Sequence, residues 1–306
     1  MGFGRTPGPR KGSKRGPAPV VPVPARRAPA KVNLGLHVLR RRLDGYHEIE
    51  TVFAPIGWAD ALTAEPHDAL TLSTSDPDLP TDRGNLVWKA AAALAEWAGI
   101  EPHARLHLDK RVPYGAGLGS GSSDAAAALR LCAELWEVQI PEPDLHRLAA
   151  ALGADVPFFL GEGAAIGTGL GDSLAPLTRA DGTPWRCPFA LCVVVPDVHV
   201  STPEAYGLVT PNDRERPDLA TAILSDDLGR WRREVTNDFE APIAARFRAI
   251  GQALDGLRDA GAGWAALSGS GSSVVGAFER VGDAEAAAEA ARACGGRVWV
   301  EAPRAA

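Results

Sequence analysis

The 306-residue sequence predicts an α+β protein with two domains, an N-terminal mixed α/β domain and a C-terminal ferredoxin-like domain of the split βαβ type. The length suits one large or two medium domains. Helix and strand patterns are mixed before about residue 170, whereas the chain after residue 180 contains segments in the order β-α-β-β-α-β. Glycine, aspartate and proline cluster at 170–185, so we place the two domains at 28–178 and 179–306.

A basic segment precedes the two domains. Residues 1–27 contain six prolines, five glycines, seven basic side chains and no acidic one. This composition cannot bury enough apolar surface to offset the loss of chain entropy, so we expect a disordered tail. A solvated extension is favoured over weak contact with nucleic acid or anionic lipid.

The rest of the chain is acidic. Because the whole chain carries −6 and the tail +7, residues 28–306 carry −13, which argues against a nucleic-acid-binding surface. The sequence has no apolar run of about eighteen residues, so no membrane span is expected. The four cysteines include no Cys-x-x-Cys pair and are expected to be small buried side chains in a reducing compartment. We therefore expect a cytoplasmic protein without nucleic-acid or membrane partners, either a monomer or a homodimer.

The N-terminal domain is expected to mix alternating strands with apolar helices. Asp44-Gly45 is a hairpin-type turn, Asn85 can cap a helix, and Gly99 and Gly153 can end helices. The patterns predict strands at 30–41, 43–56, 68–75 and 104–112, and helices at 84–100, 122–138 and 141–152.

The C-terminal domain is expected to begin with a buried strand at 189–197, followed by helical stretches that include 240–259. The patterns then predict a strand at 264–268, a loop, a strand at 274–278, a helix at 283–294 and a strand at 297–302.

A glycine- and serine-rich stretch, "PYGAGLGSGSS" (113–123), runs directly into the helix predicted at 122–138. Glycine lets consecutive backbone N–H groups turn toward one point, and the helix start adds unpaired N–H groups and a positive dipole end. Such a loop suits a phosphate, with Ser120, Ser122 and Ser123 offering hydroxyls. It matches neither a P-loop nor a dinucleotide fingerprint, and a flexible loop before a serine-capped helix remains the alternative.

Two charged residues in apolar surroundings are candidates for chemistry. Lys31 lies in "APAKVNLGL" and Asp155 in "LGADVPFFL". An ammonium and a carboxylate beside a phosphate loop are the groups that phosphoryl transfer needs, one to stabilise charge and one to deprotonate a hydroxyl. The alternatives are an edge-strand lysine and a turn or helix-capping aspartate.

Further candidates lie elsewhere in the chain. Tyr46-His47, together with Tyr206, can stack on and hydrogen-bond a heterocyclic base, although a packed tyrosine and a surface histidine are the alternative. A second glycine-serine loop, "SGSGSS" (268–273), is by itself more typical of a wide hairpin than of a site. Histidine, cysteine and carboxylate spacings show no metal-ligand set.

Several motifs together resemble one family. "PYGAGLGSGSSDAAA" is similar to the phosphate-binding signature of the GHMP kinases. "APAKVNLGLHV", "DGYHEIETVF", "LGADVPFF", "TND" (236–238) and "LSGSGSSVVGAF" narrow the resemblance to the branch that acts on 4-diphosphocytidyl-2-C-methyl-D-erythritol. The resemblance extends over about residues 28–280, in the family's order and spacing, and implies the two-domain GHMP kinase fold.

The resemblance implies an ATP-dependent kinase that phosphorylates the 2-hydroxyl of this cytidine-diphosphate sugar alcohol, in the non-mevalonate route to isoprenoid precursors. It makes Lys31 and Asp155 the catalytic pair, with Asp155 as the base. It makes Tyr46 and Tyr206 the aromatic pair on either side of the cytosine, with His47 as its hydrogen-bonding partner. It implies that the phosphates of ATP bind to the loop formed by Pro113, Tyr114, Gly115, Ala116, Gly117, Leu118, Gly119, Ser120, Gly121, Ser122 and Ser123. It implies that the cytidine substrate binds to Asn33, Tyr46, His47, Thr202, Pro203 and Tyr206. The third motif of the family, which supports the ATP loop and the site, corresponds to Gly269, Ser270, Gly271 and Ser272. Magnesium is expected with ATP, but its ligands are not identified.

The departures from the family pattern are small. Ser120 interrupts a run that is often all glycine, and Tyr114 stands where methionine is common. Another GHMP enzyme, such as a homoserine or mevalonate-type kinase, remains an alternative, as does a non-catalytic anion-binding module. Tyr46, His47 and Tyr206 argue against a substrate without a base, and Lys31 with Asp155 argues against a mere binding module.

Overall fold

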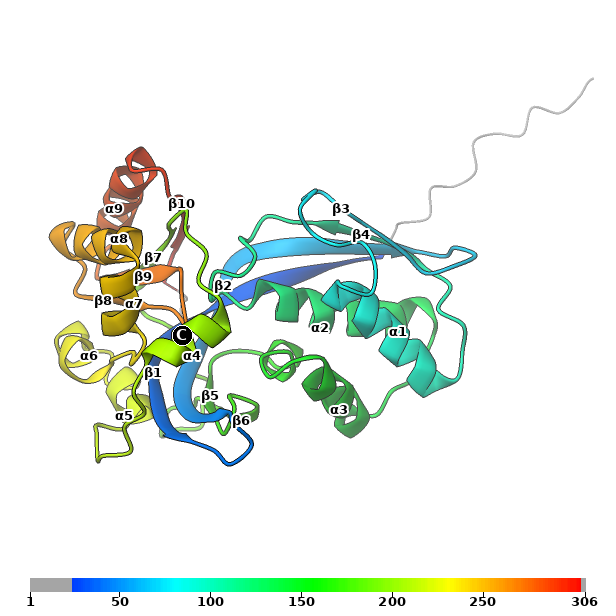
Figure 1. Cartoon of the computed structure of the whole chain (residues 1–306), viewed down its shortest axis with the longest axis horizontal. Helices are drawn as coiled ribbons and strands as arrows, with labels where there is room; N and C mark the ends of the chain where they lie inside the picture. The colour runs from blue at the N-terminus through cyan, green and yellow to red at the C-terminus, as the bar shows by residue number, and fades with distance from the viewer. Residues whose placement is uncertain (1–23, 304–306) are drawn as a thin grey trace, which may run out of the picture.

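The computed structural model describes residues 24–303, which form two β-sheets covered by helices (Figure 1). The expected tail lies outside the described residues up to position 23. Its last residues differ from the expectation, because strand β1 already begins at Ala25. Within the described range, no helix combines the length and apolar character needed to cross a membrane. Cys132 and Cys192 are buried as expected, but Cys187 is only half-buried and Cys294 is exposed.

The first sheet contains six strands from the first 176 residues. Its order is β3-β4-β2-β5-β6, with β1 paired to β2, and β3–β4 is the parallel pair among them. The Asp44-Gly45 turn joins β1 and β2 as predicted, and Gly45 adopts a φ of 89° there. The strands are β1 (Ala25–Arg41), β2 (His47–Glu65), β3 (Thr71–Thr74), β4 (Arg105–Asp109), β5 (Ala165–Thr168) and β6 (Ser173–Pro176).

The helices of this half follow the predicted signals closely. They are α1 (Leu86–Ala98), α2 (Ser120–Leu135), α3 (Glu142–Leu152) and the short 3₁₀ helix η1 (Pro157–Leu160). The Asn85 side chain accepts a hydrogen bond from the Val87 N–H, and Gly99 ends α1 with a left-handed φ of 66°. Helix α2 begins at Ser120, two residues before the predicted start, and its first turn therefore belongs to the glycine-rich loop.

The second sheet confirms the split βαβ prediction. Its order is β10-β7-β9-β8, and all neighbours are antiparallel. The elements are β7 (Ala190–Val195), α4 (Thr202–Leu208), α5 (Leu219–Ile223), α6 (Leu228–Glu234), α7 (Glu240–Arg246), α8 (Arg248–Asp259), β8 (Trp264–Leu267), β9 (Val274–Phe278), α9 (Val281–Ala293) and β10 (Arg297–Glu301). The helix predicted at 240–259 is divided in two, because Phe247 takes an extended conformation between α7 and α8 and packs against the core of this half.

The long strands β1 and β2 connect the two halves. In Figure 1 both strands run from the first sheet toward the helices of the second half. Leu36 in β1 donates its N–H to Thr236 and accepts a hydrogen bond from the N–H of Asp238. Buried side chains of β1 and β2, such as Val32 and Val52, share one apolar core with Val193 and Val275 of the second sheet. This packing brings β1 beside the loop between β8 and β9.

Candidate active site

A cavity of about 830 Å³ brings together residues from both halves of the chain. Its lining comes from β1, the β1–β2 turn, the glycine-rich loop, the turn after α3, α4 and the loop between β8 and β9. The predicted site residues in this lining are Lys31, Asn33, Tyr46, His47, Tyr114, Gly115, Gly117, Gly119, Ser122, Asp155, Thr202, Pro203, Tyr206, Gly269, Ser270 and Gly271.

The backbone of the glycine-rich loop is arranged to bind an anion. Gly115, Gly117 and Gly119 have φ values of 69°, 77° and 65°, and left-handed residues at alternate positions turn N–H groups toward one side. In the described part of the chain, none of the backbone hydrogen bonds outside regular helices and strands is donated by the N–H groups of residues 115–119. The N–H groups of residues 120–122 lie in the first turn of α2, where a helix offers no partner four residues earlier. The carbonyls of Ala116, Gly117 and Leu118, in contrast, all accept hydrogen bonds from the protein. The free donors and the start of α2 therefore remain available for phosphate oxygens.

The loop can approach its surroundings only because two positions lack a side chain. A Cβ at Gly117 would lie 2.3 Å from the Ser268 carbonyl oxygen, and one at Gly119 would lie 2.8 Å from the Phe159 ring. Ser268 donates its hydroxyl to the Gly117 carbonyl and accepts the N–H of Asn33. The second glycine-serine loop therefore supports the first one and connects it to β1.

Lys31 and Asp155 meet at the mouth of the glycine-rich loop. Their Nζ and Oδ2 atoms are 3.7 Å apart, with the lysine side chain 4% exposed and the aspartate side chain 34% exposed. Lys31 Nζ also donates to Asn33 Oδ1 at 2.6 Å and to the Gly117 carbonyl at 3.0 Å. Asn33 in turn donates to the Thr51 hydroxyl, which donates to the Gly35 carbonyl. This chain of hydrogen bonds fixes the ammonium beside the loop.

The electrostatics of the pair follow from its unequal burial. Burial lowers the pKa of Lys31, and the adjacent Asp155 carboxylate opposes that shift by favouring the charged ammonium. Burial together with the Asp155 charge raises the pKa of Tyr206 to about 12. The phenol consequently stays protonated and neutral, and both Tyr206 and the Lys31–Asp155 pair line the same cavity.

Another group of residues that line the cavity is aromatic. His47 stacks on Tyr206 with ring centroids 4.8 Å apart and an interplanar angle of 18°, and Tyr206 meets Phe239 edge to face. Burial, with a smaller effect of Arg41, lowers the pKa of His47 and favours its neutral form. Tyr46 is 65% exposed at the edge of this patch. The stack present in the structure thus pairs Tyr206 with His47, whereas the sequence-based prediction pairs Tyr206 with Tyr46 around a base.

Some predicted loop residues lie outside the cavity. Ser120 and Ser123 are buried, and the Ser120 hydroxyl donates to the Pro113 carbonyl, so Ser122 is the one of the three serines that lines the cavity. Leu118 is also buried in the core. Gly121 lies under the Tyr114 ring. The remaining predicted residues, Pro113, Ala116 and Ser272, line a neighbouring cavity of about 550 Å³.

Several residues of the site received no role from the sequence, although some of them lie within its motifs. Thr51 and Ser268 hold Asn33 and the glycine-rich loop, and Asn237 donates its amide to the carbonyls of Leu267 and Gly269. His199 lines the cavity with its ring against Gly115. Asn237 belongs to the "TND" motif, but its role becomes visible only once β1 and the β8–β9 loop are placed together.

The comparisons with known proteins agree with this architecture. Residues 85–163 match the family model of the GHMP kinases N terminal domain, and residues 219–297 match that of the GHMP kinases C terminal domain. A 4-diphosphocytidyl-2-C-methyl-D-erythritol kinase from Salinibacter ruber is 54% identical over 264 residues, which cover 86% of this chain and 93% of the relative.

Solved structures give the same result. A 4-(cytidine 5'-diphospho)-2C-methyl-D-erythritol kinase superposes with a TM-score of 0.77 at 38% identity, covering 92% of this chain and 100% of that one. A Methanococcus jannaschii mevalonate kinase superposes with a TM-score of 0.73 over 94% of this chain and 100% of its own, but at 12% identity it supports the fold alone. The chain therefore belongs to the GHMP kinases and, within them, to the family of the 4-diphosphocytidyl-2-C-methyl-D-erythritol kinases.

Proposed function

We propose that the protein transfers the γ-phosphoryl group of ATP to the 2-hydroxyl of 4-diphosphocytidyl-2-C-methyl-D-erythritol, in the non-mevalonate route to isoprenoid precursors. The observation that carries the proposal is the position of the Lys31–Asp155 pair, 3.7 Å apart, between a loop of free N–H groups and an aromatic patch. One end of the cavity suits a triphosphate and the other suits a base, so the reacting hydroxyl and phosphorus would meet at the pair.

In the proposed step, Asp155 accepts the proton of the 2-hydroxyl as its oxygen forms a bond to the γ-phosphorus. The bond from that phosphorus to the β,γ-bridging oxygen breaks, and ADP leaves with the electron pair. The ammonium of Lys31 and the N–H groups of the loop stabilise the charge on the transferred group. Lys31 is suited to this role because Asn33 and the Gly117 carbonyl hold its Nζ in place.

Magnesium would supply charge neutralisation for the phosphates. Among the residues that line the cavity, Asp155 is the one carboxylate, and Ser122 offers a hydroxyl at the start of α2. This donor set fits an ion that keeps most of its ligands as phosphate oxygens and water, which is the usual mode of Mg²⁺ binding in kinases. Residues 24–303 contain no group of three or more histidine, cysteine, aspartate or glutamate side chains that could hold a metal ion by themselves.

The aromatic patch favours a cytidine substrate over the smaller acceptors of other GHMP kinases. Tyr46, His47 and Tyr206 all line the cavity and offer aromatic rings on which a base can stack, and the neutral imidazole of His47 can donate or accept one hydrogen bond. Thr202 and Pro203 at the start of α4 lie on the same side. Homoserine and mevalonate carry no ring that would use these side chains.

The proposal is tested by measuring ADP release from ATP with three acceptors in parallel: 4-diphosphocytidyl-2-C-methyl-D-erythritol, homoserine and mevalonate. We expect turnover with the cytidyl compound alone and a product phosphorylated at the 2-position. Turnover with either small acceptor, or none with the cytidyl compound, would contradict the assignment.

A further inference from the structure

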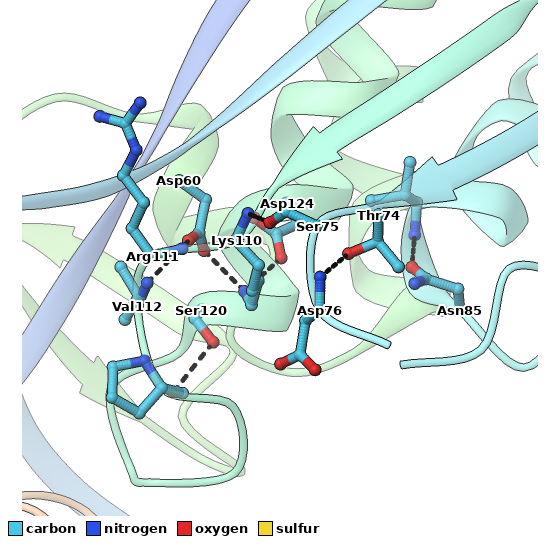
Figure 2. A network of polar contacts seen from close by, with 12 residues as sticks. Asp60, Thr74, Ser75, Asp76, Asn85, Lys110, Arg111, Val112, Ser120 and Asp124 are labelled. Atoms are coloured by element: carbon cyan, nitrogen blue, oxygen red, sulfur yellow. Dashed lines mark hydrogen bonds and ion pairs between the residues drawn. The ribbon is translucent and has the colours of Figure 1, made fainter. Parts of the chain in front are cut away.

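Three charged side chains meet in the interior beneath the glycine-rich loop, outside the active-site cavity (Figure 2). Lys110 Nζ donates to Asp60 Oδ2 and to Asp124 Oδ2, each at 2.6 Å. The side chains are almost fully buried, with 3% of Lys110, 0% of Asp60 and 4% of Asp124 exposed. Asp60 lies in β2, Lys110 directly follows β4, and Asp124 lies in the second turn of α2.

The triad contacts the chain on both sides of the loop. Before the loop, Asp60 Oδ1 accepts the backbone N–H groups of Arg111 at 2.5 Å and Val112 at 2.8 Å, just ahead of Pro113. After the loop, Asp124 directly follows Ser123. Lys110 therefore bridges a carboxylate that holds the incoming backbone to one that belongs to the outgoing helix, as Figure 2 shows.

The composition of the triad is not what stability alone would favour. Two carboxylates share one ammonium, and Asp124 Oδ1 has no hydrogen-bond partner among the described residues. Burial raises the pKa of Asp124 to about 7, with Lys110 opposing and Asp60 adding to the shift. Buried ionic groups are commonly no more stabilising than apolar side chains of similar size. These charges lie at the two ends of the glycine-rich loop, where they connect the backbone before the loop to the helix after it.

We propose that Asp60, Lys110 and Asp124 are positioning residues that hold the two ends of the glycine-rich loop together, so that its N–H groups are set for the phosphates of ATP before ATP binds. The middle of the loop has its own supports, because Lys31 N–H donates to the Leu118 carbonyl and Ser273 N–H to the Ala116 carbonyl. Loss of the triad should therefore loosen the ends of the loop first. The proposal rests on the proposed function in one respect, that the loop binds ATP.

The test compares three variants of the full chain. Asp124→Ala removes the acceptor of Lys110 in α2. Asp124→Asn retains an oxygen for Lys110 and removes the excess charge. Asp226→Asn is the matched control. Asp226 also forms an ion pair, with Arg179 at 2.7 Å, and accepts a hydrogen bond from Trp185 Nε1 at 2.9 Å. Neither of these partners belongs to the glycine-rich loop.

Two measurements are made on each folded variant: amide hydrogen exchange of peptides that cover 111–124, and calorimetric affinities for Mg-ATP and for cytidine diphosphate. For Asp124→Ala we expect faster exchange at the two ends of the loop and an affinity for ATP lower by about tenfold, because the loop must then be ordered on binding. The affinity for cytidine diphosphate should stay within about twofold of the wild type. Asp124→Asn should restore exchange and ATP affinity, and Asp226→Asn should change neither.

Unchanged loop exchange and ATP affinity in Asp124→Ala would overturn the proposal, as would an equal loss of affinity for ATP and cytidine diphosphate. If Asp124→Ala does not fold, Asp60→Ala is used, because it removes the acceptor of the Arg111 and Val112 N–H groups while leaving α2 intact, with the same expected outcomes. The result is separate from the proposed reaction: absence of turnover on the cytidyl acceptor refutes the function, while the exchange pattern still decides the role of the triad.

Discussion

Asp155 is exposed to the cavity, where an acceptor hydroxyl can reach it, and its ion pair with Lys31 holds it in place. Replacing it by asparagine keeps the shape of the side chain and removes proton acceptance. We expect Asp155→Asn to lower kcat by about 10²–10⁴, the usual contribution of general base catalysis, and to change the affinity for ATP by less than about threefold. Single-turnover kinetics and calorimetry measure the two quantities. A kcat within tenfold of the wild type would remove Asp155 as the base.

The three tyrosines of the chain allow a matched test of the base-stacking role. Tyr46 and Tyr114 are 65% and 62% exposed, so truncating either costs little stability. Tyr46 lies beside His47, whereas Tyr114 covers Gly121 of the glycine-rich loop. We expect Tyr46→Ala to raise KM for the cytidyl acceptor at least about fivefold without changing KM for ATP, since stacking on a base contributes about 1–3 kcal/mol. Tyr114→Ala should leave KM for the acceptor unchanged. Equal effects of Tyr46→Ala on both substrates would contradict the assignment.

Single residues differ in how far the sequence reveals them. Lys31 and Asp155 stand out because a charge within an apolar stretch needs a partner. Thr51 and Ser268 carry no such mark, since each is an ordinary small polar residue until the β1–β2 register and the β8–β9 loop place it against Asn33. Lys110 is one of five lysines in the sequence, and no local pattern reveals its contacts, because its partners Asp60 and Asp124 are 50 and 14 positions away.

At the scale of elements, the glycine-rich loop depends on one glycine more than on the others. Gly117 combines a φ of 77° with a Ser268 carbonyl oxygen 2.3 Å from where a Cβ would lie. Gly121, in contrast, lies in α2, and its Cβ would meet the Tyr114 ring at 3.3 Å. We expect Gly117→Ala to weaken ATP binding at least about tenfold and to lower stability by about 1–3 kcal/mol, the usual cost of a strained backbone position. Gly121→Ala should bind ATP like the wild type. Calorimetry and urea unfolding check both variants, and similar behaviour of the two would contradict this view of the loop.

Elements with local signals could be predicted, and those without could not. Helix α1 has its Asn85 cap and its Gly99 terminus in the sequence itself. The short strands β5 and β6 were not predicted, because strands of four residues carry almost no periodic pattern. They exist through pairing, β5 with β2 and β6 with β5. The break between α7 and α8 is similar: Phe247 is neither proline nor glycine, and packing against the core of the second half decides its conformation.

At the scale of the whole molecule, two buried groups should give the free energy of unfolding opposite dependences on pH. Asp124 has a folded-state pKa of about 7, above its ordinary value of 3.8, so the folded protein holds the extra proton between these values. This contribution to stability is therefore lost as the pH rises through 7. His37 in β1 has a pKa lowered to about 4 from 6.5, first by burial and then by Arg216. Its unfolded form holds the extra proton, so that contribution is lost as the pH falls from about 6.5 to 4.

Urea unfolding of the wild type, Asp124→Asn and His37→Gln between pH 5 and pH 8 separates the two effects, because each variant removes one slope and retains the other. Relative to the wild type, Asp124→Asn should gain stability as the pH rises toward 7, by up to about 1.4 kcal/mol per pH unit, and then stay level. Relative to the wild type, His37→Gln should gain stability as the pH falls below about 6.5, also by up to about 1.4 kcal/mol per pH unit.

Curves parallel to the wild type would mean that neither group changes its proton binding on folding. A slope lost only in Asp124→Asn would assign the pH response to the interior beneath the glycine-rich loop, and one lost only in His37→Gln would assign it to the strand that joins the two halves.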